Sequence, residues 1–250
     1  MLVRDAGEDV LVIGQASHAW LSGQLARAWG NQRFPAPSPR EEVCLAALQH
    51  DVGWAQVDLH PTLDARTGRP HSFLDLPQIS AHIELWSAAP SKLLTQSTYA
   101  ALLVSMHGTA LYARRDLNQL SQGDAELVRE YLSAEYGRQA ELKAQLRPDE
   151  RQLARNQRLI WTWDSLSLAV CLPWDPHTAT RVPAAEGEVD LEMHSTAPDR
   201  FALHPWPFTR PEVRVHCEAR RLRERCAGER ELIVALARAP LERLTFTLVG

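Results

Sequence analysis

The sequence predicts a mainly α-helical protein that carries a small β subdomain, so that the fold is α+β overall. Two patterns in the 250 residues support this prediction. Apolar residues recur at three- and four-residue spacing over residues 15–172, which is typical of amphipathic helices. Beyond that range they alternate with polar residues, as in half-buried strands. We therefore expect an N-terminal β-hairpin over residues 1–14, a helical domain over residues 15–172 and a β-rich subdomain over residues 173–250 packed on it.

The hairpin and the first helix follow from local patterns near the N-terminus. Leu2–Val3 and Val10–Ile13 are apolar runs on either side of the polar turn Asp5–Asp9, which predicts two paired strands. Helical spacing begins immediately afterwards in Gln15–Trp29, and Gly30-Asn31 supplies a C-terminal stop. The chain is therefore expected to pass directly from a hairpin into a helix.

Further helices are expected up to residue 172. In the second one, Ser38 is the expected N-cap, Pro39 the first helical residue and Glu41 an acid that suits the unpaired N–H groups of a helix start. The remaining helices are expected to start at Asp75 with Pro77, to span Ser97–Ala113 and Asp124–Leu146, and to start again at Pro148-Asp149.

Glycine and proline residues between the second and third helices predict a long loop. Gly53, Pro61, Gly68 and Pro70 mark a segment of about twenty residues without periodicity, and loops of this length in compact domains are often functional. We expect a lid or a substrate-binding loop here.

The strands of the β-rich subdomain are predicted from alternation. Val189, Leu191 and Met193 alternate with polar residues, and the same pattern occurs in 213–217 and 244–248. A short helix is expected at 229–239. Because the ends of a chain often meet in space, the N-terminal hairpin is expected to join the same sheet.

Composition excludes several classes of function. The formal net charge is -4 with acidic and basic residues interspersed, so no basic field for a nucleic acid polymer or an anionic membrane is present. The four cysteines form no Cys-x-x-Cys pair and have apolar neighbours, which favours a reducing compartment. The first residues resemble no secretory leader. We therefore expect a cytoplasmic protein that acts on a small-molecule substrate, in an oligomeric state that the sequence leaves open.

Six ionisable residues on or next to the apolar helix faces are the candidate metal ligands. Taken singly, a histidine on an apolar helix face is more often a hydrogen-bonded core residue than a metal ligand. Together, their burial without partners would cost several kcal/mol each, whereas a shared cation satisfies all of them. Six nitrogen and oxygen ligands exceed what one tetrahedral ion needs, which favours a dinuclear site. The candidates are His18, His50, Asp51, His82, His107 and Asp164.

The order of these six residues resembles the HD-domain superfamily of metal-dependent phosphohydrolases. Gln15–His18, His50–Trp54, Ser105–Gly108 and Asp164–Leu168 are more narrowly similar to an uncharacterised bacterial domain-of-unknown-function family related to that superfamily. This resemblance covers nearly the whole chain. It implies an HD-type helical fold for residues 15–172.

The resemblance also implies roles for the ligands. Asp51 would bridge two ions, with His18, His50 and Asp164 completing one shell and His82 and His107 holding the other ion. Asp51 and Asp164 are thus the predicted catalytic residues. The implied metals are iron or manganese, with zinc, nickel or cobalt as alternatives. A water shared by two such ions is a nucleophile near neutral pH.

We predict from this resemblance a metal-dependent phosphohydrolase that acts on a small phosphorylated metabolite or a nucleotide. Two alternatives stay open, because ligand identity does not separate them: a diiron oxygenase of the HD type, and a non-catalytic protein that binds a metal or a ligand.

Candidate substrate-binding residues are chosen by their distance along the chain from the ligands. Gln15 lies one turn before His18 and Trp54 follows the His-Asp pair, although a core role is the simpler interpretation for Trp54. Basic residues that could bind phosphate are Arg69, Lys92, Arg114 and Arg115. His60 and His71 are alternates to His82 as metal ligands, whereas structural or surface roles are expected for His177, His194, His204 and His216.

Overall fold

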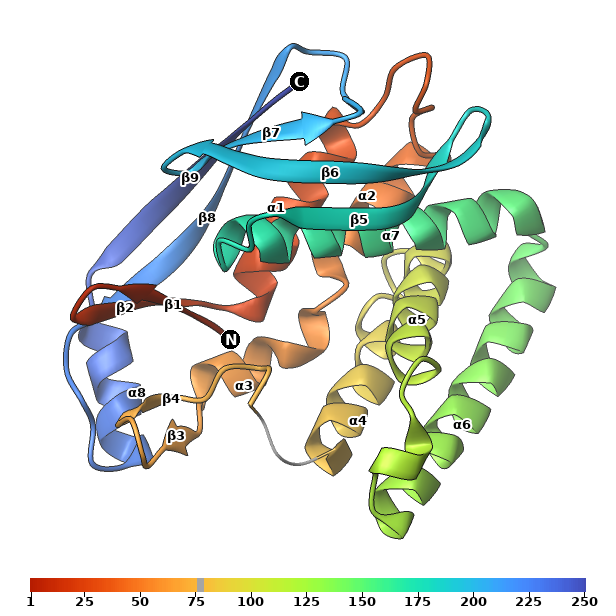
Figure 1. Ribbon diagram of the computed structural model, residues 1–250. Helices are drawn as coiled ribbons and strands as arrows, with labels where there is room; N and C mark the ends of the chain where they lie inside the picture. The colour runs from red at the N-terminus through yellow and green to blue at the C-terminus, as the bar shows by residue number, and fades with distance from the viewer. Residues whose placement is uncertain (76–78) are drawn as a thin grey trace.

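The computed structural model describes residues 1–75 and 79–250 and has a mixed α+β fold (Figure 1). A seven-stranded sheet with the order β1-β2-β8-β9-β7-β6-β5 lies over a set of helices, of which α1 and α7 pack against it. The strands are β1 (Leu2–Ala6), β2 (Asp9–Ile13), β5 (His177–Ala184), β6 (Gly187–Ala197), β7 (Arg200–His204), β8 (Glu212–Leu222) and β9 (Leu241–Val249).

The sheet joins the two ends of the chain, as expected. β1 and β2 form an antiparallel hairpin, and β2 pairs with β8 through Val10 opposite Leu222. β8 pairs with β9 along its length, and only β7 and β9 run parallel. The predicted alternating segments 189–193, 213–217 and 244–248 lie in β6, β8 and β9.

The sheet is larger than the sequence predicts, because β5 and β7 were not expected. β5 contains Pro183, and its register with β6 shifts between Ala179 and Val182, where Arg181 has a φ of 56°. This irregularity breaks the alternation of buried and exposed side chains. β7 is only 5 residues long, which is too short for a clear period.

Apart from α3, which was not predicted, the helices lie close to the predicted ranges. They are α1 (Gln15–Ala28), α2 (Arg40–Gln49), α3 (Ala55–Leu59), α4 (Ile79–Ala88), α5 (Thr98–Tyr112), α6 (Gln122–Leu146), α7 (Glu150–Cys171) and α8 (Glu229–Arg238). Ser97 caps α5 by accepting a hydrogen bond from the N–H of Ala100, and Asp149 caps α7 in the same way. These caps satisfy N–H groups that a helix start leaves unpaired.

Two predicted helix starts do not match a start that the structure describes. α2 begins at Arg40 with Pro39 as its N-cap, so the predicted cap at Ser38 was wrong by one residue, and no side chain caps this helix. The predicted start of the third helix at Pro77 lies outside the described residues, and α4 is described from Ile79 onward.

The predicted long loop is wrong in part, because this segment contains short regular elements. A single 3-10 turn (Val52–Trp54) leads into α3, and β3 (Leu63–Asp64) pairs with β4 (Arg69–Pro70). Elements of this length show no detectable periodicity. Gly53 lets the turn approach α4, since a Cβ atom there would clash with the carbonyl oxygen of Leu85.

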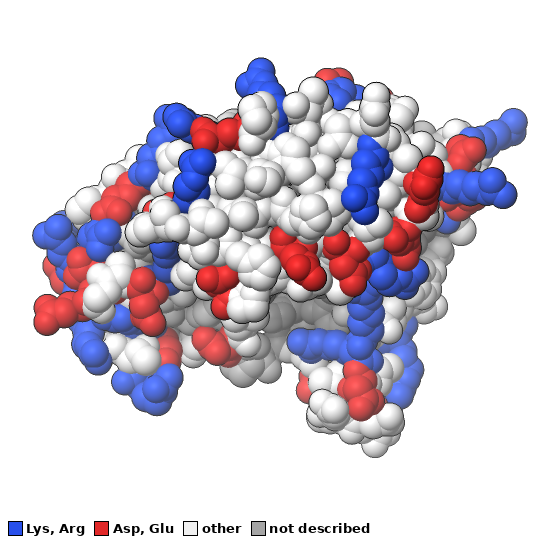
Figure 2. Space-filling view, turned by 45° about the horizontal axis from the view of Figure 1, so that its top comes forward, with Lys and Arg blue, Asp and Glu red and all other residues white. Residues whose placement is uncertain are grey.

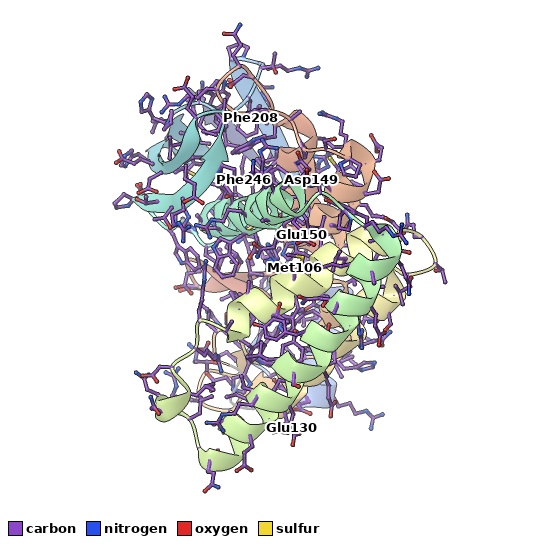
Figure 3. All side chains as sticks on the ribbon, turned by 90° about the vertical axis from the view of Figure 1, so that its right-hand side faces the viewer. Met106, Glu130, Asp149, Glu150, Phe208 and Phe246 are labelled. Atoms are coloured by element: carbon purple, nitrogen blue, oxygen red, sulfur yellow. The ribbon has the colours of Figure 1, made fainter. Side chains whose placement is uncertain are left out.

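Helices and sheet share one hydrophobic core. Trp29, the C-cap residue of α1, makes edge-to-face contacts with Trp163 of α7 at 5.7 Å and with Phe208 at 5.5 Å between ring centroids. Phe246 of β9 belongs to the same buried cluster. Figure 3 shows both phenylalanines on the sheet side of α7, and α6 outside α5. The core therefore anchors α1 and α7, while the division into three parts stays a prediction.

The surface carries no dominant charge on the face shown in Figure 2. Acidic and basic side chains lie intermingled around an area of uncharged residues. Within residues 1–75 and 79–250, no helix combines the length and the apolar character needed to cross a membrane.

Candidate metal centre

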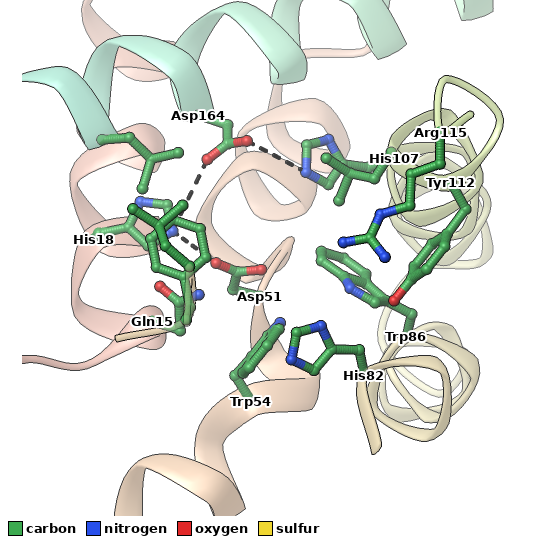
Figure 4. Close-up of a pocket in the computed structure, with 14 residues that line it drawn as sticks. Gln15, His18, Asp51, Trp54, His82, Trp86, His107, Tyr112, Arg115 and Asp164 are labelled. Atoms are coloured by element: carbon green, nitrogen blue, oxygen red, sulfur yellow. Dashed lines mark hydrogen bonds and ion pairs between the residues drawn. The ribbon is translucent and has the colours of Figure 1, made fainter. Parts of the chain in front are cut away.

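Five of the predicted ligands meet inside the helical layer, and we call them the inner cluster: His18, His50, Asp51, His107 and Asp164 (Figure 4). They come from separate elements. α1, α5 and α7 each contribute one residue, and the His-Asp pair follows the last residue of α2. Each histidine is at most 1% exposed, and the two carboxylates are nearly buried. Groups this polar are rarely buried without partners.

The Nε2 atoms of the inner histidines face the two carboxylates. The distance from His18 Nε2 to Asp51 Oδ2 is 2.6 Å. His50 Nε2 lies 3.5 Å from the same oxygen and 3.3 Å from Oδ1 of Asp164. His107 Nε2 lies 3.5 Å from the other oxygen of Asp164. Nitrogen and oxygen atoms thus converge from both sides on one small space.

The far side of each ring determines which nitrogen carries the lone pair. His50 Nδ1 lies 2.9 Å from the carbonyl oxygen of Ala47, an acceptor only, so Nδ1 carries the proton. His18 Nδ1 lies 2.8 Å from Ser167 Oγ, whose own proton goes to the carbonyl oxygen of Asp164. In their neutral forms both rings therefore direct a bare Nε2 at carboxylate oxygens. Lone pairs facing each other at these distances require a cation between them.

Without a metal, a proton on His50 supplies part of this positive charge. Burial alone would lower the pKa of His50, but the charges of Asp51 and Asp164 outweigh it and raise the pKa to about 9. Burial and the neighbouring charge of His50 lower the pKa of His107 to about 4. Asp164 keeps a pKa well below its usual value despite its burial, because His50 and His107 stabilise its charge. The cluster is therefore built to hold positive charge.

The donor set fits a metal ion. The ligand atoms of His18, His50 and Asp51 lie within 4.8 Å of one another, and so do those of His50, His107 and Asp164. Imidazole nitrogen and carboxylate oxygen together suit zinc, iron, manganese and nickel. The two groups share His50 and adjoin each other, so this region could hold one ion or two.

His82 of α4 belongs to neither group. Its ring lies 5.0 Å from that of Trp54, and its buried Nε2 has no hydrogen-bond partner among the described residues. Burial and the positive charge of Arg115 lower its pKa, which keeps the imidazole neutral. His82 is therefore available as a ligand on the cavity beside the inner cluster.

This cavity has a volume of about 260 Å³ and opens beside Asp51 and Asp164. We call the residues of its wall beyond the inner cluster the outer wall. They are Gln15, Trp54, Phe73, Leu74, His82, Trp86, Leu111, Tyr112, Arg115 and Leu168. The wall is mostly apolar and carries a few polar groups, which is typical of small-molecule sites.

Gln15 and Trp54, two of the predicted substrate-binding residues, lie in this wall. Both are 3% exposed, and Gln15 Oε1 and Trp54 Nε1 have no hydrogen-bond partner among the described residues. The N–H of Gln15 donates to Asp58 Oδ2 at 2.5 Å, which fixes the start of α1 against α3. Their polar atoms are available to a ligand or to water.

The other predicted contributors lie elsewhere. Arg69 and Lys92 donate hydrogen bonds to backbone carbonyl oxygens and do not line the cavity. His60 is exposed, and His71 is within 3.1 Å of Thr62 in the β3–β4 region, so neither replaces His82. Distance along the chain was a poor guide for these residues, because their side chains contact other parts of the fold.

Two further residues at the site, Arg115 and Ser167, lie at helical spacing from predicted ligands. Arg115 was considered only for its place in the chain, yet it continues the four-residue spacing of His107 and Leu111 and reaches the cavity (Figure 4). Ser167 follows Asp164 by three residues, so both lie on one face of α7. Helical spacing from a predicted ligand identifies both.

The fold and the site define a class of protein: a mixed α+β chain with buried, adjoining His/Asp groups that could hold a metal. More narrowly, the chain belongs to the family described as "Protein of unknown function (DUF3891)", whose model matches residues 1–224. All six predicted ligands lie within the matched residues. No curated protein and no solved structure gives a significant match to the chain.

Proposed function

We propose that this protein is a metal-dependent phosphohydrolase of the HD type, with a small phosphorylated molecule as its substrate. The observation that carries the proposal is the convergence of bare Nε2 atoms on the oxygens of Asp51 and Asp164 beside a cavity. The order of the ligands along the chain, which resembles that of HD-type hydrolases, supports the reaction.

Two ions are proposed, and the chain divides its ligands between them. His18, His50 and Asp164 would hold one ion, His107 and His82 the other, and Asp51 would bridge both. When bound, the ions would activate a water molecule and neutralise charge that develops on a phosphoryl oxygen. The proposed sharing explains why two carboxylates lie among so many buried imidazoles.

Residues around the ligands orient them and control water. Ser167 and the carbonyl oxygen of Ala47 hold His18 and His50 in the tautomer that presents Nε2. Gln15 Oε1 is a buried acceptor at the inner end of the cavity, where water or a substrate hydroxyl can donate to it. Phe73, Leu74 and Leu168 form an apolar part of the cavity wall.

The test is turnover of phosphomonoesters, phosphodiesters and nucleotides by manganese-loaded protein without oxygen, alongside metal analysis. We expect phosphate release that persists anaerobically, because hydrolysis needs no redox change. Asp51→Asn, which keeps the side-chain shape but removes the bridging charge, should abolish release.

Either of two results would favour an alternative function over the proposed hydrolase. If the iron-loaded protein gives a mixed-valent iron signal, consumes oxygen with a small hydroxylated substrate and cleaves no phosphoester, the diiron oxygenase alternative is correct. If the fully loaded protein shows neither reaction, the site serves metal or ligand binding alone.

A further inference from the structure

One cation that reaches the cavity forms no ion pair with any residue that the structure describes. Arg115 follows the C-terminal end of α5, and Figure 4 shows its guanidinium group directed into the cavity between Trp86, Tyr112 and His82. Its Cζ atom lies 5.6 Å from the centre of the Tyr112 ring, which holds the group by a cation–π contact. Within the described residues, no carboxylate forms an ion pair with it. An anion from outside the chain is the missing partner.

The neighbouring arginine provides a contrast. Arg114 places its Cζ atom 4.1 Å from the centre of the Trp161 ring and does not line the cavity. Both arginines are exposed and adjacent in sequence, yet only one points at the site. The direction of Arg115 is therefore a property of its position after α5 and not of surface arginines in general.

Unpaired polar atoms in the same wall indicate that the ligand is polar at more than one point. Gln15 Oε1 is a buried acceptor, and Trp54 Nε1 is a buried donor. Leaving such groups unpaired in the bound state would cost roughly 1–3 kcal/mol each. A ligand that carries both an anionic group and a hydroxyl group would satisfy this wall.

The volume of the cavity limits the rest of the ligand. Small-molecule sites usually measure roughly 300–1,000 Å³, whereas this cavity holds about 260 Å³. Its remaining lining is apolar: Phe73, Leu74, Trp86, Leu111 and Leu168. The enclosed space therefore favours a compact ligand over one that carries a nucleobase and a ribose beside its phosphate.

We propose that Arg115 binds the phosphoryl group of the substrate and that the substrate is a compact hydroxylated phosphomonoester, not a nucleotide, an inference that rests on the proposed phosphohydrolase function. A guanidinium group presents two parallel N–H donors to phosphate oxygens. With the metal ligands on the inner side and Arg115 on the outer side, the phosphoryl group is held from two directions.

Binding of inorganic phosphate to the manganese-loaded protein, measured by calorimetry, tests the role of Arg115 without turnover. We expect Arg115→Gln to weaken phosphate binding roughly 10- to 100-fold, the loss of a charge-assisted contact. Arg115→Lys should recover part of the affinity, and Arg114→Gln should bind like the wild type. Metal content and circular dichroism must be unchanged in all three variants, which the exposure of both arginines favours.

Equal phosphate affinities for Arg115→Gln and Arg114→Gln would overturn the assignment of Arg115. The size of the substrate is tested separately, by comparing kcat/KM for three- and four-carbon hydroxylated phosphomonoesters with that for nucleoside monophosphates. Comparable values for the two sets would overturn the limit on size. If phosphate binds through Arg115 but no ester is hydrolysed, the proposed function fails while the anion site stands.

Discussion

The inner cluster and the outer wall of the cavity differ in how their buried polar atoms are paired. In the inner cluster, His18 and His50 are hydrogen-bonded on their far sides, and their Nε2 atoms all face carboxylate oxygens. In the outer wall, Gln15, Trp54 and His82 leave buried polar atoms without partners. The first arrangement lacks a cation, and among the described residues His107 Nδ1 also has no partner. The second arrangement is incomplete until a molecule with its own donors and acceptors binds.

The two regions also differ in the elements that carry their residues. α1 and α7, which carry His18 and Asp164, share the large core beneath the sheet. Trp54 and Arg115 instead lie in a single 3-10 turn and just beyond the end of α5. Two of the ion ligands thus lie on helices that share the large core, whereas a short turn and a helix end present two of the groups that would contact a substrate, as is common in binding sites.

The largest expected effect is the loss of metal when the inner cluster loses its bridging carboxylate. Asp51→Ala removes the oxygen that both His18 and His50 face, so we expect metal content to fall from about two ions per chain to near zero. Elemental analysis after reconstitution with manganese or iron measures this. His204→Ala, on β7 and outside the cavity, is the control and should keep its metal.

A change in the outer wall should have a partial effect. His82→Ala removes one ligand of the proposed second ion and leaves the inner cluster intact, so we expect about one ion to stay bound. Metal analysis of His82→Ala beside Asp51→Ala makes the comparison direct. Equal losses in the two variants would argue against bridging by Asp51, and an unchanged content would assign His82 to the substrate instead.

The stability of the metal-free protein should depend on pH through the inner cluster. Because the pKa of His50 is raised from 6.5 to about 9, its contribution is fully present below pH 6.5 and is lost as the pH rises through 9. This difference corresponds to about 3 kcal/mol. Because the pKa of His107 is lowered to about 4, its contribution is present above pH 6.5 and is lost as the pH falls towards 4.

Metal-free protein should therefore be most stable near pH 6.5. Urea unfolding in the presence of a chelator, from pH 5 to pH 9.5, measures the free energy of unfolding. The His50→Gln variant has no titratable group at this position, so its free energy of unfolding should decrease much less above pH 6.5 than that of the wild type. A wild-type stability that rises between pH 6.5 and pH 9 would contradict the proton-holding role of His50.

The smallest expected effect concerns the orientation of a ligand. Ser167→Ala removes the hydroxyl that contacts His18 Nδ1 at 2.8 Å and leaves the ring in place. We expect metal affinity to fall by roughly tenfold, which competition with a chromogenic chelator measures. The matched control is Ser165→Ala. Ser165 also lies on α7, but its hydroxyl group is hydrogen-bonded to His177 instead of His18. An affinity equal to that of the control would mean that packing alone orients His18.

Much of the fold was predictable because its signals are local. The hairpin, the helices α1, α5, α6 and α7, and the strands β6, β8 and β9 each carry a clear period or a capping residue. β5, β7 and the elements between Trp54 and Pro70 carry none, because they are irregular or only a few residues long. The strands among them depend on the pairings of β3 with β4, of β5 with β6, and of β7 with β6 and β9, and not on a period in the sequence.

The sequence by itself determined which residue types could form a metal centre, since histidine and aspartate recur on apolar helix faces where burial without partners is costly. Only the tertiary structure decided which of them meet. It brought His18, His50, Asp51, His107 and Asp164 within a few ångströms, left His82 on the cavity wall, and turned Arg115 towards the site and Arg69 away from it. The physical reason is that helix faces are set by local spacing, whereas the positions of helices relative to one another are set by the core they share.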